Sequence, residues 1–313
     1  MGKRLPSIFN NKKSFEPAVQ PKVPYHLIGI EVEVERVADK ICSDECPAGW
    51  TITEDGSLRN NGLEFVSKPF MSKYVHSMVL RLAEYLPSSC EFSSRTSVHV
   101  HFNVLDMTVD ELKTAMALYV VFERSLFDFV GKDRDQNIYC QPVYNLYNAH
   151  KAFRINVPKW GKYSAMNLNS IQEKGTVEFR HMYGNCDADL LTTWVDLITR
   201  VFDFARGKKF EETVDSLQAL STSSAWHGFS KEVFGELSSI FERQVNFKDN
   251  MQQGVRFLRS VTFRAPENLF MEFLKSDYLK YRVPDRYRDW ETDRKSTRLN
   301  SSHSGESRMP SSA

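Results

Sequence analysis

Several features that would point to a special class of protein are scarce or missing in this 313-residue chain. Lys plus Arg number 41 and Asp plus Glu number 40, so the formal net charge is +1 and no general affinity for nucleic acid is expected. The sequence contains no apolar run long enough to cross a bilayer, so we expect no membrane association. No internal repeat is evident either, which argues against a fibrous protein.

Cysteine is also scarce, with five residues in the chain. Their spacing shows no disulfide framework, and the close pair Cys42 and Cys46 lacks the two further ligands that a zinc site needs. The basic N-terminal stretch has no apolar core of the kind found in signal peptides. Together these absences predict unligated thiols and a cytoplasmic protein.

The two ends of the chain differ in composition from the rest. Residues 1–24 are polar and contain several prolines, so we predict a flexible leader. Residues 293–313 back-translate to two blocks of a common short-read sequencing adapter, in one reading frame and separated by a gap of index size. We therefore predict that this tail is a sequencing artefact and not native, although its composition alone would suggest a Ser-rich disordered segment.

Between the ends, short alternating segments predict strands. Residues 28–35 alternate Ile or Val with Gly or Glu, which gives a strand one apolar and one acidic face. Alternation also marks 62–67, 97–103 and 176–182, while helical patterns mark 71–85, 108–130, 187–205 and, less regularly, 208–285. Antiparallel strands combined with helices predict the α+β class.

The polar faces of these strands carry an unusual set of side chains. Successive strand residues point to opposite faces, so each group in the following set shares one face. The groups are Glu31, Glu33 and Glu35; Glu64; His99, His101 and Asn103; and Glu178 with Arg180. Each face could simply meet water. If the strands share one sheet, however, the carboxylates would hold a hard divalent cation and Arg180 could clamp a phosphate oxygen.

Several motifs resemble one protein family, in the expected order. They are Gly29-Ile-Glu31-Val-Glu33, the Asp55-Gly56-Ser57 turn, Gly62-Leu-Glu64-Phe-Val-Ser67-Lys-Pro69, Ser97-Val-His99-Val-His101, Glu123, Arg134 to Cys140, Lys162-Tyr163 with Asn167-Leu168-Asn169, and Thr176-Val-Glu178-Phe-Arg180. This set resembles the amidoligase family of the carboxylate–amine ligase superfamily, which includes glutamine synthetase and glutamate–cysteine ligase. Lys162 departs from the pattern, because arginine is more often expected there and lysine cannot form its bidentate contacts.

The resemblance implies a fold and a division of the chain. The fold would be a curved antiparallel sheet with the active site on its concave face, backed by helices, as in the catalytic fold of glutamine synthetase. The amidoligase-like catalytic domain would cover residues 25–206, and residues 207–292 would form a mainly helical C-terminal region. Family members often occur in phage and bacterial genomes, which suggests such a source.

The resemblance also implies roles for individual residues. The predicted magnesium ligands are Glu31, Glu33, Glu64, Glu178 and His99. The predicted nucleotide contacts are His99, His101, Lys162 and Arg180. The predicted catalytic residues are Arg180, Arg134 and Glu178. The stretch 132–175, rich in Asn, Tyr and Lys, is predicted to form a loop that closes over the site.

The implied reaction is an ATP- and magnesium-dependent ligation through an acyl-phosphate. Its substrates would be a small-molecule or peptide carboxylate and an amine donor or ammonia, and an amidotransferase-type protein is a further partner that the resemblance suggests. Two other readings remain open. The same His and Glu residues could activate water in a metal-dependent hydrolase, or the chain could be a non-catalytic binding protein on a ligase scaffold.

Overall fold

The computed structural model of the chain describes residues 26–37, 46–144 and 163–262. The predicted leader 1–24, the predicted tail 293–313, Cys42 and Lys162 lie outside the described residues. The predicted division at residues 206 and 207 stays a prediction. Among the described helices, none is both long and apolar enough to cross a membrane.

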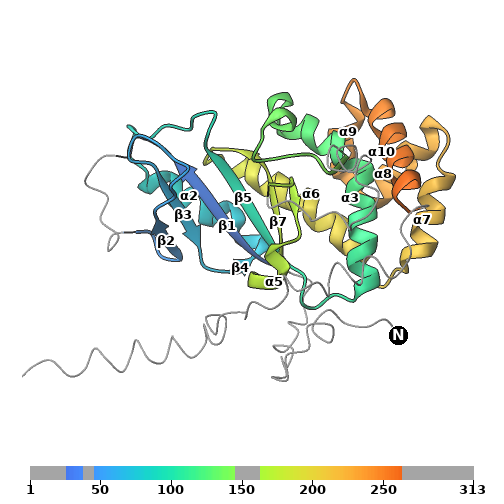
Figure 1. The fold of residues 1–313 in the computed structure, drawn as a ribbon, viewed down its shortest axis with the longest axis horizontal. Helices are drawn as coiled ribbons and strands as arrows, with labels where there is room; N and C mark the ends of the chain where they lie inside the picture. The colour runs from blue at the N-terminus through green and yellow to red at the C-terminus, as the bar shows by residue number, and fades with distance from the viewer. Residues whose placement is uncertain (1–25, 38–45, 145–162, 263–313) are drawn as a thin grey trace, which may run out of the picture.

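The described strands form one seven-stranded antiparallel sheet (Figure 1). Its order is β2-β3-β1-β5-β7-β6, and β4 also pairs with β1. The strands are β1 (Leu27–Val34), β2 (Trp50–Thr53), β3 (Leu63–Ser67), β4 (Phe70–Met71), β5 (Ser97–Asn103), β6 (Met166–Asn167) and β7 (Thr176–Tyr183). Because β1, β5 and β7 lie at the centre, side chains from distant parts of the sequence become neighbours.

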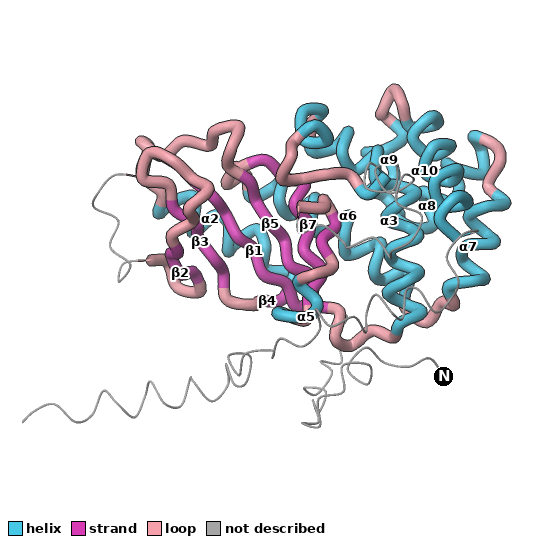
Figure 2. Tube along the Cα trace, in the orientation of Figure 1, coloured by secondary structure: helices cyan, strands magenta, loops and turns pink. Residues whose placement is uncertain are grey.

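One face of the sheet is covered by α2 (Val75–Tyr85) and α6 (Ala188–Ala205), as Figure 2 shows. The apolar residues of β1 point to this side, and Ile28, Ile30, Val32 and Val34 are at most 1% exposed. Phe102 of β5 stacks on Phe202 of α6 with ring centroids 4.4 Å apart, and Phe65 of β3 meets Tyr85 of α2 at 6.2 Å. The alternation of apolar residues along the strands therefore fixes which face becomes core.

A second group of helices lies around α3 (Val109–Val130), beside the sheet (Figure 1). Thr108 and Glu111 form the predicted capping box at its start. The ring of Phe122 on α3 packs against Phe229, Phe234 and Phe241. The helices of this layer are α7 (Phe210–Ala219), α8 (Ser223–Phe234), α9 (Ser238–Glu242) and α10 (Phe247–Thr262). Of these, α7 and α10 pack on α3, while α8 and α9 pack on each other.

The predicted α+β class, with a curved antiparallel sheet backed by helices, is confirmed. One predicted helix, 71–85, begins later: a 3-10 turn, η2 (Ser72–Tyr74), precedes α2 at Val75. The reason is that Phe70 and Met71 pair with Ile28 and Leu27 of β1. Within the predicted loop 132–175, a 3-10 helix η3 (Lys132–Gln136), β6 and α5 (Ser170–Lys174) are regular, while 145–162 lie outside the described residues.

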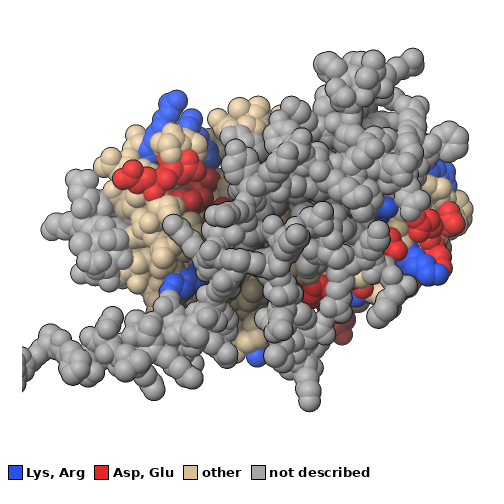
Figure 3. Space-filling view, turned by 60° about the horizontal axis from the view of Figure 1, so that its bottom comes forward, with Lys and Arg blue, Asp and Glu red and all other residues tan. Residues whose placement is uncertain are grey.

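Figure 3 shows charged side chains of both signs on one face of the molecule. In Figure 3, acidic and basic side chains lie beside each other at both ends of the view. This mixture agrees with the net charge of +1.

Candidate functional site

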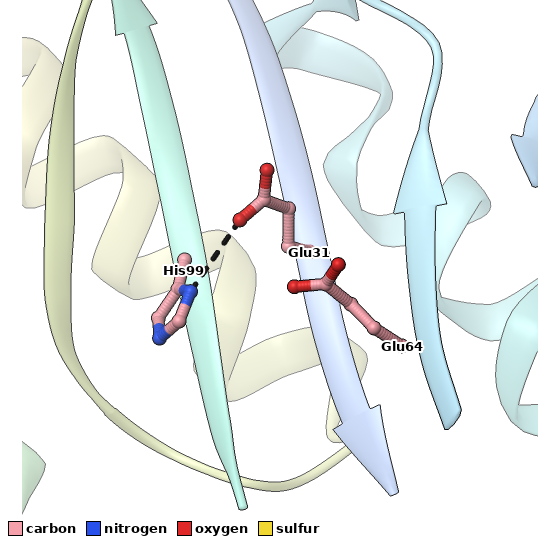
Figure 4. Close-up of side chains that lie close together, drawn as sticks. All are labelled: Glu31, Glu64 and His99. Atoms are coloured by element: carbon pink, nitrogen blue, oxygen red, sulfur yellow. Dashed lines mark hydrogen bonds and ion pairs between the residues drawn. The ribbon is translucent and has the colours of Figure 1, made fainter. Parts of the chain in front are cut away.

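The strand register brings the predicted polar side chains to one face of the sheet. Glu31 pairs with His99 and Glu33 with Glu64, while His101 pairs with Glu178. Paired residues in antiparallel strands project to the same side. In Figure 4 the side chains of Glu31, Glu64 and His99 lie together in front of neighbouring strands, with helices behind the sheet. We call the surface formed by Glu31, Glu33, Glu64, His99, His101 and Glu178 the carboxylate face.

His99 lies at the centre of the carboxylate face and is 4% exposed. The Ser97 hydroxyl donates to Glu33 Oε2 at 2.7 Å and also lies 2.8 Å from His99 Nε2. Since the hydroxyl has a single proton, His99 Nε2 must carry the hydrogen of the second contact. His99 Nδ1 therefore faces Glu31 Oε2 at 3.4 Å and Glu178 Oε1 at 3.6 Å.

The charges around His99 decide its protonation. Burial lowers the pKa of His99, and the positive charge of Arg180 acts in the same direction. The contact with Glu31 and the charges of Glu178 and Glu33 outweigh both effects, so the pKa of His99 is raised. The glutamates of the carboxylate face thus carry more negative charge than the other side chains of the face neutralise.

Glu31 lies in contact with two histidines and a lysine. Its Oε1 lies 3.1 Å from His101 Nε2 and accepts a bond from Lys174 Nζ at 2.7 Å. Burial favours the neutral acid, but His101, His99 and Lys174 hold the pKa of Glu31 well below its ordinary value. Glu31 is therefore ionised although it is only 9% exposed.

Glu178 is held by donors from β6, α5 and its own strand. Asn167 Nδ2 and Ser170 Oγ donate to its Oε2 at 2.7 and 3.0 Å, and Arg180 Nη1 donates to Oε1. Burial raises the pKa of Glu178, but His99, His101 and Arg180 lower it to about 2. Arg180 is oriented in turn by a bond from Nε to the Tyr139 carbonyl at 3.0 Å.

The carboxylate face has the chemistry of a divalent-cation site. Three groups of side chains have ligand atoms within 4.8 Å of one another: Glu31, Glu64 and His99; Glu31, His101 and Glu178; and Glu33, Asp55 and Glu64. Carboxylate oxygens suit magnesium or manganese, and a histidine whose other nitrogen is already bonded is a typical oriented ligand. Burial and the charges of Glu31 and Glu33 raise the pKa of Glu64, a crowding that a cation would relieve. The residues present therefore fit such an ion.

Not every predicted site residue lies on the carboxylate face. Arg180 adjoins it through Glu178, but Arg134 lies on η3 and is only 7% exposed. Arg134 donates from Nε to the His181 carbonyl at 2.7 Å and from Nη2 to the Arg180 carbonyl at 2.9 Å. Through these bonds Arg134 supports the backbone of Arg180 and His181. The catalytic role predicted for Arg134 stays a prediction, as does the nucleotide contact predicted for Lys162.

The structure adds site residues that the sequence did not single out. Lys174 and Ser170 come from the short helix α5, and Ser97 begins β5. Asp55 joins Glu33 and Glu64 from the turn after β2. Its Asp-Gly turn signal was visible in the sequence, but its distance to Glu64 depends on the pairing of β2 with β3. No local signal identifies Lys174, because its partner Glu31 lies on a strand far away in sequence.

β7 contains a bulge between Phe179 and Met182. Val100 of β5 pairs with Phe179 and Val98 with Met182, so β7 has one residue more than its partner. His181 then points to the helical side, where its Nε2 lies 2.8 Å from the Tyr119 hydroxyl on α3. Arg134 binds the carbonyls of the bulge. The Arg180 N–H donates to the Ala165 carbonyl at 2.8 Å, so both backbone polar groups of Arg180 are bonded.

A buried carboxylate, Glu123, lies behind this bulge. It accepts bonds from the Tyr119 hydroxyl at 2.7 Å and from the backbone N–H groups of Val143 and Tyr144 at 2.7 and 3.2 Å. Burial raises the pKa of Glu123 to about 7, although these donors oppose the shift. The Tyr119 hydroxyl donates its only hydrogen to Glu123, so His181 Nε2 must donate to the Tyr119 oxygen. His181 is neutral, because burial and the charge of Arg134 lower its pKa to about 3.

Glu123→Gln is expected to change how stability depends on pH. Between its unfolded pKa near 4.5 and its folded pKa of about 7, the folded wild type retains a proton that the unfolded chain has lost. Raising the pH through this window should therefore destabilise the wild type by on the order of 2 to 3 kcal/mol relative to the variant. Urea unfolding of both proteins from pH 5 to 8 measures the difference.

The control for this prediction is Glu84→Gln, which changes an exposed glutamate on α2. It is expected to leave the pH dependence of unfolding nearly as in the wild type. Parallel stability curves for wild type and Glu123→Gln across the whole range would contradict the assignment of a buried titrating group at residue 123.

Comparisons with known proteins give a family match and similar solved structures. The family described as "Putative amidoligase enzyme" matches residues 21–202. A comparison with curated proteins finds no match. Among solved structures, the chain is similar to one in "Crystal structure of the complex between Prokaryotic Ubiquitin-like Protein Pup and its Ligase PafA", with 11% identity, a TM-score of 0.37 and coverage of 88% of this chain and 69% of that chain. The family match contains every residue of the carboxylate face.

Proposed function

Because this chain belongs to the amidoligase family of amide-forming ligases, we propose that it joins a carboxylate to an amine or ammonia with cleavage of ATP. Magnesium is the proposed metal and an acyl-phosphate the proposed intermediate. The substrates would be a small-molecule or peptide carboxylate and an amine donor. The proposed location is the cytoplasm, and a phage or bacterial source and an amidotransferase-type partner remain further proposals.

One observation carries the proposal: carboxylates and imidazoles from β1, β3, β5 and β7 converge on one face with an arginine beside them. Glu31, His99 and Glu178 are each less than 10% exposed, and Glu31 Oε2 and Glu178 Oε1 lie 3.4 and 3.6 Å from His99 Nδ1. A face that served only solubility would be open to water and would mix charges along each strand. Buried like charges of this kind suit a site that binds a cation together with an anionic ligand.

The first step of the proposed reaction transfers a phosphoryl group. An oxygen of the substrate carboxylate attacks the γ-phosphorus of ATP, the bond to the β-phosphate oxygen breaks, and ADP leaves. Magnesium bound by Glu31, Glu178 and a histidine of the face would neutralise phosphate charge. Arg180, oriented by Glu178 and the Tyr139 carbonyl, adds a positive charge beside the transferring group.

The second step forms the amide. The amine nitrogen attacks the carbonyl carbon of the acyl-phosphate, the bond from carbon to the phosphate oxygen breaks, and the proton lost by the amine leaves with inorganic phosphate. Water would compete with the amine, so this step requires a site shielded from solvent. The low exposure of His101 and Glu178, 5% and 6%, supports such shielding on the sheet side.

The proposed function predicts ADP release that depends on both organic substrates. The purified chain, with magnesium and ATP, is screened over a panel of carboxylates crossed with amines, and ADP is measured by a coupled assay. We expect at least one pair to raise ADP release about a hundredfold or more over ATP and magnesium alone, since positioning and charge neutralisation supply most of such catalysis. Mass spectrometry of that reaction should show the amide.

Other outcomes distinguish the remaining functions. Bond cleavage in the same panel without ATP would favour a metal-dependent hydrolase that uses His99, His101 and the glutamates. Stabilisation by magnesium and ATP in a thermal shift, with no turnover of any pair, would favour a binding protein on a ligase scaffold. Absence of both binding and turnover would refute the ligase.

A further inference from the structure

The ammonium group of Lys174 lies against the carboxylate face, and the proposed reaction gives it no role. Lys174 ends α5, and its Nζ lies 2.7 Å from Glu31 Oε1 and 3.5 Å from His101 Nε2. Glu31 and His101 belong, with Glu178, to one group of side chains that could hold a metal. Lys174 therefore places a positive charge on a carboxylate that this group would offer to a cation.

The Lys174 ammonium can leave this position without a change in fold. The backbone at the end of α5 is fixed, because Gly175 has a φ of +70° and donates to the Ile171 carbonyl at 3.1 Å. A Cβ added to Gly175 would come within 2.6 Å of Leu105. The Lys174 side chain, by contrast, is 39% exposed and has a flexible four-carbon stem. The side chain can therefore swing away while its Cα stays in place.

Building on the ligase function above, we propose that Lys174 is an internal cation that competes with the divalent metal for Glu31. An ammonium and a divalent ion repel each other strongly when both approach one carboxylate that is shielded from water. The metal alone must therefore displace the Lys174 ammonium from its partner. A nucleotide changes this balance, because its phosphates offer the displaced ammonium a new anionic partner.

The competition determines how metal and nucleotide binding to the site depend on each other. Metal alone binds weakly because Lys174 resists it, whereas metal that arrives with nucleotide binds more tightly because the ammonium gains a phosphate contact. The same lysine then contributes charge beside the transferring group, together with Arg180. Lys174 thus couples metal binding to nucleotide binding in one site.

The test measures metal binding directly rather than activity. Electron paramagnetic resonance follows Mn²⁺ binding to the full chain, with and without a non-hydrolysable ATP analogue. Lys174→Met removes the charge and keeps the stem, so it should tighten Mn²⁺ binding without nucleotide by about tenfold. The variant should also show a smaller gain in Mn²⁺ affinity when the nucleotide is added.

Two further variants act as controls. Lys174→Arg keeps a positive charge and should bind Mn²⁺ much like the wild type. Lys231→Met removes an exposed lysine on α8 and should also match the wild type, which excludes a general effect of net charge. Equal Mn²⁺ affinity of wild type and Lys174→Met would overturn the competition and leave the ligase intact. If neither protein binds Mn²⁺ with or without nucleotide, both proposals fail.

Discussion

Glu31→Gln is expected to lower ADP release by about 10²- to 10³-fold while leaving the protein folded. Glu31 takes part in two of the three groups that could hold a metal, and its carboxylate meets His99, His101 and Lys174. An amide of the same shape removes the negative charge and keeps the packing, so cation binding should suffer far more than stability. Steady-state ADP release gives the rate, and thermal unfolding followed by circular dichroism confirms the fold.

Glu35→Gln is the matched control for this prediction. Glu35 belongs to the same acidic pattern and is as deeply buried, with 4% exposure against 9% for Glu31. Its carboxylate accepts the Arg59 backbone N–H at 2.9 Å and pairs with Arg95 at 3.6 Å, away from His99 and Glu178. A glutamine oxygen can still accept that N–H, so ADP release should stay within about twofold of wild type. Full activity of Glu31→Gln would remove Glu31 from the proposed mechanism.

Gly254→Ala is expected to destabilise the protein by about 3 kcal/mol or more, although alanine normally favours a helix. Gly254 lies on α10 against α3, and an added Cβ would come within 2.7 Å of the Val121 Cα and 2.8 Å of its carbonyl carbon. These are backbone atoms, so a side-chain rotation cannot relieve the clash. Urea unfolding measures the loss, and limited proteolysis shows whether α10 separates from α3.

Gly228→Ala provides the comparison within the same helical layer. Gly228 lies in the interior of α8, and an added Cβ there would meet no atom within 4 Å. We expect this variant to gain about 0.5 to 1 kcal/mol, because alanine restricts the unfolded chain and favours the helix. If Gly254→Ala were as stable as Gly228→Ala, the close approach of α10 to α3 would be wrong.

Strand and helix positions were largely predictable because local patterns carry them. The alternation in residues 28–35 matches β1, and its apolar members are the ones buried against the helices. Thr108 caps α3 and Asp187 caps α6, where each side chain accepts a backbone N–H three residues later. Such signals depend on residues that are close in sequence, so they can be recognised from one amino-acid sequence.

The missed elements depend on contacts between distant residues. β4 and β6 have two residues each, too few for an alternating pattern, and they exist because they pair with β1 and β7. The sequence showed which side chains share a face within one strand. It could not show that Glu33 pairs with Glu64, or that Lys174 reaches Glu31, because register and long-range packing determine both contacts.

The extra residue in β7 has a consequence for chain length. Without the bulge, Arg180 and Met182 would still project to their present opposite sides, because removing His181 restores the simple alternation of the strand. What a chain shortened there would lose is the hydrogen bond between His181 and Tyr119 on α3, together with the His181 carbonyl that accepts from Arg134. A deletion of His181 should therefore preserve the set of ligands and weaken one polar contact between β7 and α3, while the apolar packing of the sheet on α2 and α6 stays.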